Sequence, residues 1–312
     1  MAEERLPKST REGFGDGLLE AGKDRRVVVL VADLLESTRT QEFKLVHPER
    51  CFDVGVAEQN LITVAAGLAS SGKIPFACGF AIFLAGRSYD QVRLHAGISH
   101  LNMKIIGSHA GLLTGEDGAT HQALEDIGQM RAIPGIKVIS PADYVEAKAA
   151  TKAIARLEGP VYLRLGRDKL PIIYPETYRF RLGKGVVLRE GTDITIIATG
   201  PMVHEALKAH NMLKFLHISS RVINIHTIKP LDKELILRAA QETRAIITAE
   251  DHSICCGLGS AVAEFLSETR PTKMWRIGMV ERFGESGRPE ELYRKFGMTA
   301  SDIVKAARKL LK

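Results

Sequence analysis

Apolar, β-branched runs alternate with segments of helical periodicity along most of the chain. Strands are predicted at Val27–Ala32, Lys104–Gly107, Ile136–Ser140, Val161–Leu165, Ile194–Thr199, Arg221–His226, Ala245–Ala249 and Met274–Gly278. Helices are predicted at Asn60–Ser70, Tyr144–Leu157, Met202–Leu213, Leu231–Gln241 and, at the end of the chain, Asp302–Lys312. Such alternation of strand and helix predicts an α/β fold with parallel or mostly parallel sheets covered by helices.

The alternation is interrupted once, at Pro171–Lys184. This stretch carries two prolines and no regular periodicity, so it is typical of a linker. A chain of 312 residues is long enough for two domains. We therefore expect one domain over residues 1–180 and a second over residues 181–312.

Composition narrows the functional classes. The 43 basic and 37 acidic residues give 43 − 37 = +6, and the excess is scattered rather than gathered in a stripe with aromatic residues. Nucleic acid is therefore not an expected partner. No apolar run approaches the roughly 20 residues of a membrane helix, and the first residues do not resemble a secretory signal. A cytoplasmic protein without a membrane segment is expected, with Cys51, Cys78, Cys255 and Cys256 as buried thiols.

Glu58 follows a strand-like run and precedes an apolar helix. In open α/β sheets, the junction between a strand and the next helix is where ligands bind. The alternative is a carboxylate that only stabilises the helix N-terminus through the helix dipole. The local pattern leaves both interpretations open.

A polar loop, Gly115–Gln122, holds Glu116, Asp117 and His121 between two predicted elements, and His109 lies a few residues before it. The loop is a candidate site, with a solvated loop as the alternative. Arg164 and Arg167 end a strand, and arginine is suited to forked contacts with phosphate. At their spacing, Phe80 and Phe83 are more often core residues than cofactor contacts.

Taken together, several segments resemble the C-terminal half of transketolase. The segments are GVAEQNLITVAAGLA, GRSYDQVR, GSHAGLLTGEDGATHQALEDIGQMRAIPG, IKPLD and AEDHS, and they span nearly the whole chain. The resemblance implies a pyrimidine-binding domain followed by a transketolase C-terminal domain. It also implies transfer of a two-carbon ketol unit from a ketose phosphate to an aldose phosphate, with thiamine diphosphate as cofactor, in the pentose phosphate pathway.

The resemblance assigns roles to individual residues. Glu58 matches the glutamate that contacts the aminopyrimidine ring of the cofactor, and Phe80, Phe83 and Asp33 match other residues on the cofactor side. The third aromatic residue of some relatives corresponds to Gly86, which leaves that wall more open. The implied substrate ligands are Ser37, His109, Asp117, His121 and Arg167. Glu58, His109 and His121 are the implied catalytic residues.

The diphosphate-binding half of the family is not matched by this sequence. In thiamine-diphosphate enzymes, Gly-Asp-Gly followed by Asn about two dozen residues later holds the diphosphate and Mg²⁺. Here Gly15–Gly17 has this composition, but it precedes the first strand and no Asn occurs before Asn60. We expect it inside a first helix, and we expect no metal ligands in this chain.

The sequence therefore predicts one subunit of a split transketolase. The partner is an N-terminal transketolase subunit that holds Mg²⁺ or Ca²⁺, and the expected assembly is a heterotetramer in which this chain also self-associates. Three alternatives remain: the β subunit of a 2-oxo acid dehydrogenase, deoxyxylulose-phosphate synthase, and a non-catalytic partner subunit. The β subunit would not need the set Ser37, His109, His121 and Arg167.

Overall fold

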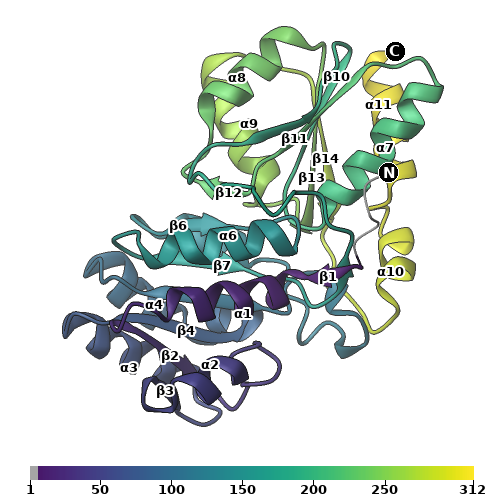
Figure 1. Cartoon of the computed structure of the whole chain (residues 1–312). Helices are drawn as coiled ribbons and strands as arrows, with labels where there is room; N and C mark the ends of the chain where they lie inside the picture. Colours follow the sequence, from purple (N-terminus) through teal and green to yellow (C-terminus); the bar gives the residue numbers. More distant parts are fainter. Residues whose placement is uncertain (1–5) are drawn as a thin grey trace.

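The first sheet has seven strands, and its central strands are buried on both faces. A computed structural model describes residues 6–312. The strands are β2 (Val27–Val31), β3 (Cys51–Asp53), β4 (Ile74–Phe80), β5 (Lys104–Ser108), β6 (Lys137–Ile139), β7 (Val161–Arg164) and β12 (Thr227–Lys229). Their order is β12-β6-β7-β5-β4-β2-β3, and only β12 is antiparallel to its neighbour (Figure 1).

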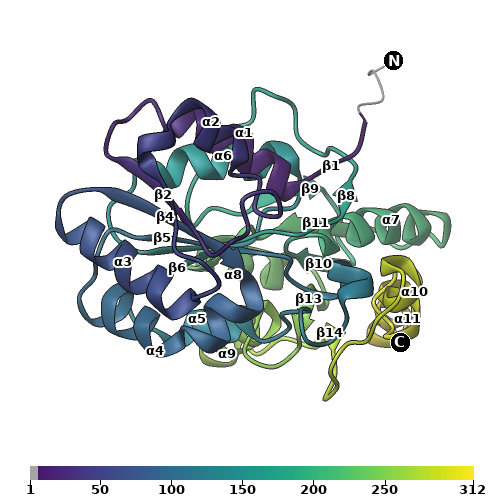
Figure 2. The same ribbon diagram turned by 90° about the horizontal axis from the view of Figure 1, so that it is seen from below.

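Helices cover both faces of this sheet because successive residues of its strands point to opposite sides. Along β2, Val27, Val29 and Val31 face one layer, and Val28 and Leu30 face the other. The first layer holds α1 (Thr10–Ala21), α2 (Gln41–Val46) and α6 (Tyr144–Ala155). The second holds α3 (Glu58–Ser70), α4 (Tyr89–Val92) and α5 (Asp126–Ala132) (Figure 2). The first unit is therefore a three-layer sandwich.

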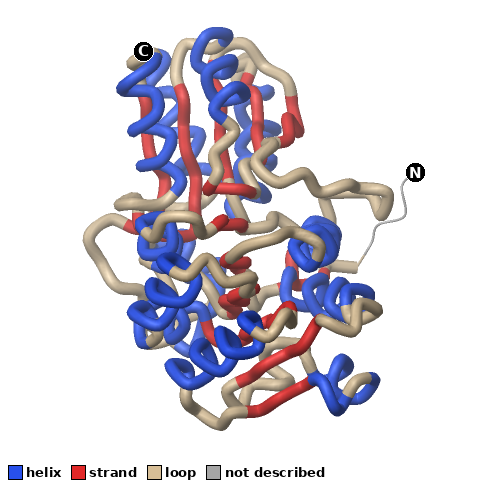
Figure 3. Tube along the Cα trace, turned by 90° about the vertical axis from the view of Figure 1, so that its left-hand side faces the viewer, coloured by secondary structure: helices blue, strands red, loops and turns tan. Residues whose placement is uncertain are grey.

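The second unit is built on a smaller sheet. Its strands are β9 (Val186–Arg189), β10 (Ile194–Ala198), β11 (Ser220–Asn224), β13 (Ile246–Ser253) and β14 (Met274–Met279), in the order β14-β13-β10-β11-β9. Only β9 is antiparallel to its neighbour. The helices α7 (Met202–Phe215) and α11 (Ala300–Leu311) cover one face, and α8 (Lys233–Glu242) and α9 (Leu258–Thr269) cover the other. The second unit stands on one end of the first (Figures 1 and 3).

Short elements complete the chain. They are β1 (Lys8–Ser9) and β8 (Lys169–Leu170), which pair with each other, α10 (Pro289–Lys295), two 3₁₀ turns, η1 (Pro48–Arg50) and η4 (Leu112–Asp117), and two π-helical turns, η2 (Phe83–Arg87) and η3 (Arg93–Ile98). Among residues 6–312, no helix combines the length and the apolar composition needed to cross a bilayer.

The α/β class and the mostly parallel sheets are confirmed. Each strand and helix predicted from the sequence is present, with ends shifted by a few residues. The sequence analysis missed β4, which lies near the middle of the first sheet, because Pro75 and Gly79 interrupt its apolar run. Two of the expected buried thiols are wrong: Cys51 and Cys78 are buried, but Cys255 and Cys256 are exposed in the loop after β13.

The division at residue 180 stays a prediction. The segment that follows β8, which pairs with β1 outside the two main sheets, leads to β9 at the edge of the second sheet. A boundary at a single residue does not separate the two sheets, because β12 lies in the second part of the sequence but pairs with β6 of the first sheet.

The Gly15–Gly17 segment lies inside α1, as expected. This helix packs closely on α6, and a Cβ added at Gly17 would come within 2.8 Å of the carbonyl oxygen of Lys148. The hydroxyl of Tyr144 donates a hydrogen bond to the Asp16 carboxylate. Helix packing accounts for these residues.

A buried ion pair connects the two units. Arg164, at the end of β7, donates from Nε to Asp126 at 2.8 Å and from Nη2 to the carbonyl oxygens of Ala123 and Asp251, at 3.0 and 2.9 Å. Tyr162 donates to the same Asp126 oxygen at 2.7 Å. Because Asp251 lies on β13, a single guanidinium holds both sheets.

A second buried contact lies on the opposite side of the junction. Glu146 of α6 accepts hydrogen bonds from the side chains of Asn224 on β11, at 2.9 and 3.0 Å, and of Tyr178, at 2.8 Å. The backbone N–H of Ala142 donates to it at 2.7 Å. Burial raises the pKa of Glu146 to about 7, although these hydrogen bonds act in the opposite direction.

The raised pKa of Glu146 predicts a pH-dependent stability. The folded state binds this proton more tightly than the unfolded state, so the contribution is full below about pH 4.5 and is lost as the pH rises through about 7. We expect Glu146→Gln to gain stability relative to the wild type between pH 5 and pH 8, as urea unfolding followed by circular dichroism would measure. Glu268→Gln, at an exposed position of α9, is the control. A constant difference between Glu146→Gln and wild type would contradict the assignment.

Candidate active site

The predicted site residues lie at the carboxyl ends of the parallel strands of the first sheet. Glu58 is the first residue of α3, after the loop that leaves β3, and it is 2 % exposed. Its Oε2 accepts a hydrogen bond from Nη1 of Arg87 at 2.9 Å. Glu58 therefore begins a helix at a strand-to-helix junction, a position that agrees with a ligand contact and with stabilisation of the helix N-terminus alike.

An aromatic cluster lies beside the end of β4. Phe80 is the last residue of β4 and Phe83 the first of η2, with ring centroids 6.1 Å apart. The His121 ring stands edge-on to both, at 5.8 and 5.4 Å. The His109 ring lies 4.2 Å from that of Phe80. A Cβ added at Gly86 would meet nothing within 4 Å, so this side of the cluster is open.

His109 is held in an unusual backbone conformation directly after β5. Its φ is +55°, and its Nδ1 lies 2.9 Å from the hydroxyl of Ser108. Burial lowers the pKa of His109 to about 3, and the charges of Arg11 and Arg167 add to this effect. The ring is therefore neutral near pH 7 and acts there as a hydrogen-bonding group rather than a cation.

A basic cluster lies next to His109. Arg167 donates from Nη1 to the Thr114 carbonyl at 2.9 Å and to Asp117 at 3.2 Å. Arg11, in the first turn of α1, donates to the Ser37 carbonyl at 3.1 Å. Burial and then the charges of Arg39 and Arg167 lower the pKa of Arg11. The Nε atoms of Arg11 and Arg39 are buried with no hydrogen-bond partner among residues 6–312. An anion would satisfy this cluster.

The loop that carries Asp117 and His121 is positioned by the second unit. Gly115 and Gly118 have positive φ, at +74° and +76°, which explains the glycines. Gln122 donates to the carbonyl oxygens of Gly115, at 3.1 Å, and of Glu285, at 2.9 Å. The segment between β14 and α10 therefore holds this loop in place.

The structure does not bring all the predicted residues together. Asp33, at the end of β2, has a positive φ of +57°, and its N–H donates to Asp53 at 2.9 Å. Its carboxylate is exposed and makes no hydrogen bond or ion pair within residues 6–312. Arg164 is wrong as a phosphate ligand, because its guanidinium is buried in the junction with Asp126.

Two residues of this site were missed by sequence reasoning. Arg11 lies 98 residues before His109 and 156 before Arg167 in the sequence, and no pattern in the first helix marks it. Arg87 lies within GRSYDQVR, but nothing in that segment indicates a contact with Glu58. Residues 6–312 contain no group of three His, Cys, Asp or Glu side chains placed to bind a metal ion.

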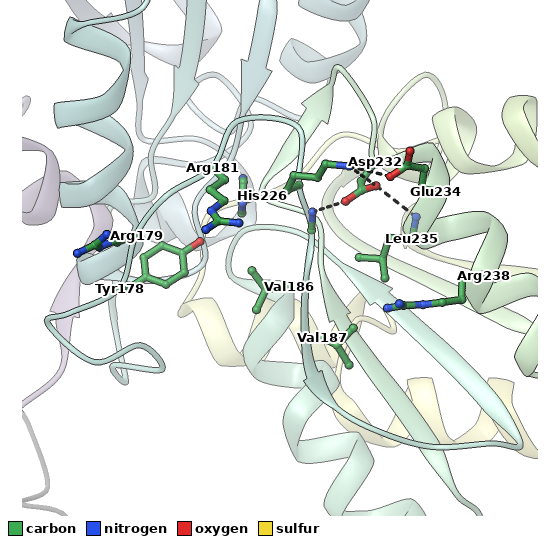
Figure 4. A pocket seen from close by; sticks show the side chains of 12 residues that line it. Tyr178, Arg179, Arg181, Val186, Val187, His226, Asp232, Glu234, Leu235 and Arg238 are labelled. Atoms are coloured by element: carbon green, nitrogen blue, oxygen red, sulfur yellow. Dashed lines mark hydrogen bonds and ion pairs between the residues drawn. The ribbon is translucent and has the colours of Figure 1, made fainter.

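A cavity of about 470 Å³ lies elsewhere, between the segment that joins the two units and α8 (Figure 4). Tyr178, Arg181, His226 and Arg238 are among its lining residues, and no predicted site residue lines it. Its carboxylates are engaged, since Asp232 accepts from the N–H groups of Gly185 and Leu235 and Glu234 pairs with Lys184. We therefore place the candidate catalytic centre at Glu58 and the aromatic cluster, and not in this cavity.

Comparison with known proteins identifies the fold. Residues 7–172 match the family described as transketolase, pyrimidine binding domain, and residues 183–303 match transketolase, C-terminal domain. The chain belongs to the transketolase family. These two matches cover most of the chain and agree with the order of the two units.

Relatives of similar length include separate subunits of split transketolases. A 6-deoxy-6-sulfo-D-fructose transketolase subunit of Clostridium sp. is 47% identical over 95% of this chain and 92% of its own. One subunit of the apulose-4-phosphate transketolase of Phocaeicola vulgatus is 38% identical over 97% of each chain. A solved structure described as a split gene transketolase, inactive β4 tetramer, has a TM-score of 0.91 at 47% identity, over 97% of this chain and 98% of its own. The chain is a transketolase-family subunit.

Proposed function

We propose that this chain is the catalytic C-terminal subunit of a two-subunit transketolase. It transfers a two-carbon ketol unit from a ketose phosphate to an aldose phosphate, with thiamine diphosphate, and it works with a separate N-terminal subunit. The observation that carries the proposal is a buried carboxylate, Glu58, beside an aromatic cluster and next to a partly unsatisfied basic cluster.

The residues fit one half of the cofactor. An aminopyrimidine ring is flat and has nitrogen atoms that can share a proton with a carboxyl group, so Glu58, Phe80 and Phe83 would hold it. Bound thiamine diphosphate supplies the carbon nucleophile for the carbonyl of a ketose. Glu58 would hold the proton that is shared with ring atom N1′, in a site from which water is largely excluded. Diphosphate and Mg²⁺ or Ca²⁺ would be held by the partner.

The remaining residues fit a sugar with an anionic end. Arg11, Arg167 and Ser37 would bind the anionic group, because guanidinium groups form strong charge-assisted hydrogen bonds. Neutral His109 and His121 would hydrogen-bond substrate oxygens and move protons there, and Asp117 would bind a substrate hydroxyl. The names of the two relatives contain a sulfonated and a phosphorylated sugar, and both sugars carry such an anionic group.

Because this chain would hold only the aminopyrimidine half of the cofactor, the site suggests how the enzyme assembles. Asp33, Glu58 and Phe83 would face the partner in a heterotetramer of two chains of each kind. The solved relative is described as an inactive tetramer of one chain type, which supports a chain that self-associates without its partner.

The direct test is reconstitution. We expect the isolated chain to be inactive with thiamine diphosphate, Mg²⁺, xylulose 5-phosphate and ribose 5-phosphate, because residues 1–312 contain no diphosphate-binding motif of the family. Co-expression with an N-terminal transketolase subunit should give a complex that turns over, measured by coupled assay and sedimentation. Robust turnover by the isolated chain would reject the two-subunit arrangement, and a stable complex without ketol transfer would reject the activity.

Glu58 gives a sharper prediction. In the reconstituted complex, Glu58→Ala should slow hydrogen–deuterium exchange at C2 of the cofactor by roughly 100- to 10,000-fold, the usual range for loss of acid–base assistance. Exchange is measured by NMR after acid quench. Glu268→Ala is the control, and circular dichroism verifies folding. Equal exchange rates in Glu58→Ala and wild type would remove Glu58 from the mechanism.

The basic cluster predicts selectivity. Arg11→Ala and Arg167→Ala should each raise KM for phosphorylated sugars by roughly 10- to 150-fold, since one charge-assisted hydrogen bond contributes about 1.5–3 kcal/mol. The effect on kcat should be smaller, and hydroxypyruvate, which has no phosphate, should be much less affected. Arg238→Ala, at an exposed position on α8, is the control. Equal losses for both donors would make these arginines structural.

A further inference from the structure

Arg87 makes two contacts that together define a position in the site. Nη1 donates to Oε2 of Glu58 at 2.9 Å, and the guanidinium carbon lies 4.7 Å from the centroid of the Phe83 ring. The Arg87 side chain is 51% exposed, whereas that of Glu58 is 3% exposed. The arginine therefore lies over the aromatic cluster and covers the buried carboxylate from the solvent side.

These are the contacts expected of the aminopyrimidine ring. Guanidinium is flat and delocalised, it stacks on aromatic rings, and it donates N–H groups to carboxylates. A flat aminopyrimidine packed on Phe83 and hydrogen-bonded to Glu58 would use the same ring and the same carboxylate. Arg87 already donates to Oε2 of Glu58 and lies over Phe83, so a ring that used the same oxygen and the same aromatic face would have to displace it. The pair and the bound cofactor are therefore alternatives.

Little else holds Arg87 in place. Among residues 6–312, its side chain forms no hydrogen bond or ion pair except with Glu58, and the one aromatic ring over which its guanidinium lies is that of Phe83. Its neighbour Gly86 has open space around it, and Arg87 is the last residue of η2. The side chain can thus swing toward solvent without unpacking the core.

We propose that Arg87 is a displaceable occupant of the pyrimidine position. In the free subunit it fills the space over Phe83 and pairs with Glu58, and it leaves when the cofactor enters. This inference rests on the proposed function. It makes Arg87 a residue that sets the threshold for cofactor binding and keeps the buried carboxylate paired until then.

The test uses the full chain and 4-amino-5-hydroxymethyl-2-methylpyrimidine, the aminopyrimidine half of thiamine, in calorimetric and NMR titrations. Arg87→Met removes the competing guanidinium, and its affinity for this probe should rise about tenfold, the loss of one charge-assisted competing bond. Arg26→Met is the matched control: Arg26 forms an ion pair of 2.8 Å with Asp24 at the opposite end of the sheet. This control should bind like wild type.

A double variant distinguishes competition for Glu58 from a role of Arg87 in packing alone. If Arg87 acts by competing for Glu58, the Arg87→Met substitution should raise probe affinity in wild type but not in the Glu58→Ala background. Arg87→Met/Glu58→Ala should therefore bind the probe no more tightly than Glu58→Ala. Circular dichroism verifies that each variant is folded. Probe affinity that is equal to or lower than that of wild type in Arg87→Met, or no measurable binding by that variant, overturns the proposal. A gain that persists without Glu58 also overturns it.

The co-expressed complex distinguishes this inference from the proposed function. Equilibrium dialysis with thiamine diphosphate should give tighter binding by Arg87→Met than by wild type. If the wild-type complex binds the cofactor and Arg87→Met binds no more tightly, only the role of Arg87 fails. If no complex binds thiamine diphosphate, the proposed function fails.

Discussion

The geometry of this molecule depends on one buried charge pair, Arg164 with Asp126. Burial alone would raise the pKa of Asp126, but Arg164 and His252 outweigh that effect and the pKa is lowered. The same guanidinium binds the carbonyl oxygen of Asp251, whose carboxylate accepts from the N–H of Leu112 at 3.0 Å. Leu112 begins the turn that leads to Asp117. The pair therefore fixes both the junction of the sheets and the candidate substrate loop. Removing one member of such a pair commonly costs about 3–5 kcal/mol.

The fold was largely predictable from the local pattern of apolar residues, because strands buried on both faces appear in the sequence as uninterrupted apolar runs. β4 was not predicted because Pro75 and Gly79 are unfavourable in central strands. Its strand conformation is stabilised by pairing with a strand on each side, which the local sequence does not show. The antiparallel partner of β6 was also hidden. Its three residues belong to a segment whose other contacts lie in the second unit.

The candidate site was predictable where chemistry and local pattern coincide, as in the loop of Asp117 and His121. It was not predictable where a residue acts through position alone. Arg11 and Arg87 are ordinary helix residues in sequence, and only the fold brings them to His109 and Glu58. Arg164 and Arg167 show the opposite difficulty: they are three residues apart, yet one is buried in the junction and the other reaches the loop.

The pairing of β12 with β6 has a consequence for how the chain can be divided. Lys229, the last residue of β12, donates to the carbonyl oxygens of Arg131 and Ile133 at the end of α5, at 2.8 and 2.6 Å. The later unit thus closes the hydrogen-bonding edge of the earlier sheet. Cutting the linker and discarding the second unit would leave the backbone of β6 unpaired on that side, a template for sheet-to-sheet aggregation. The two units match separate sequence families, but a strand from the later part of the chain completes the first sheet.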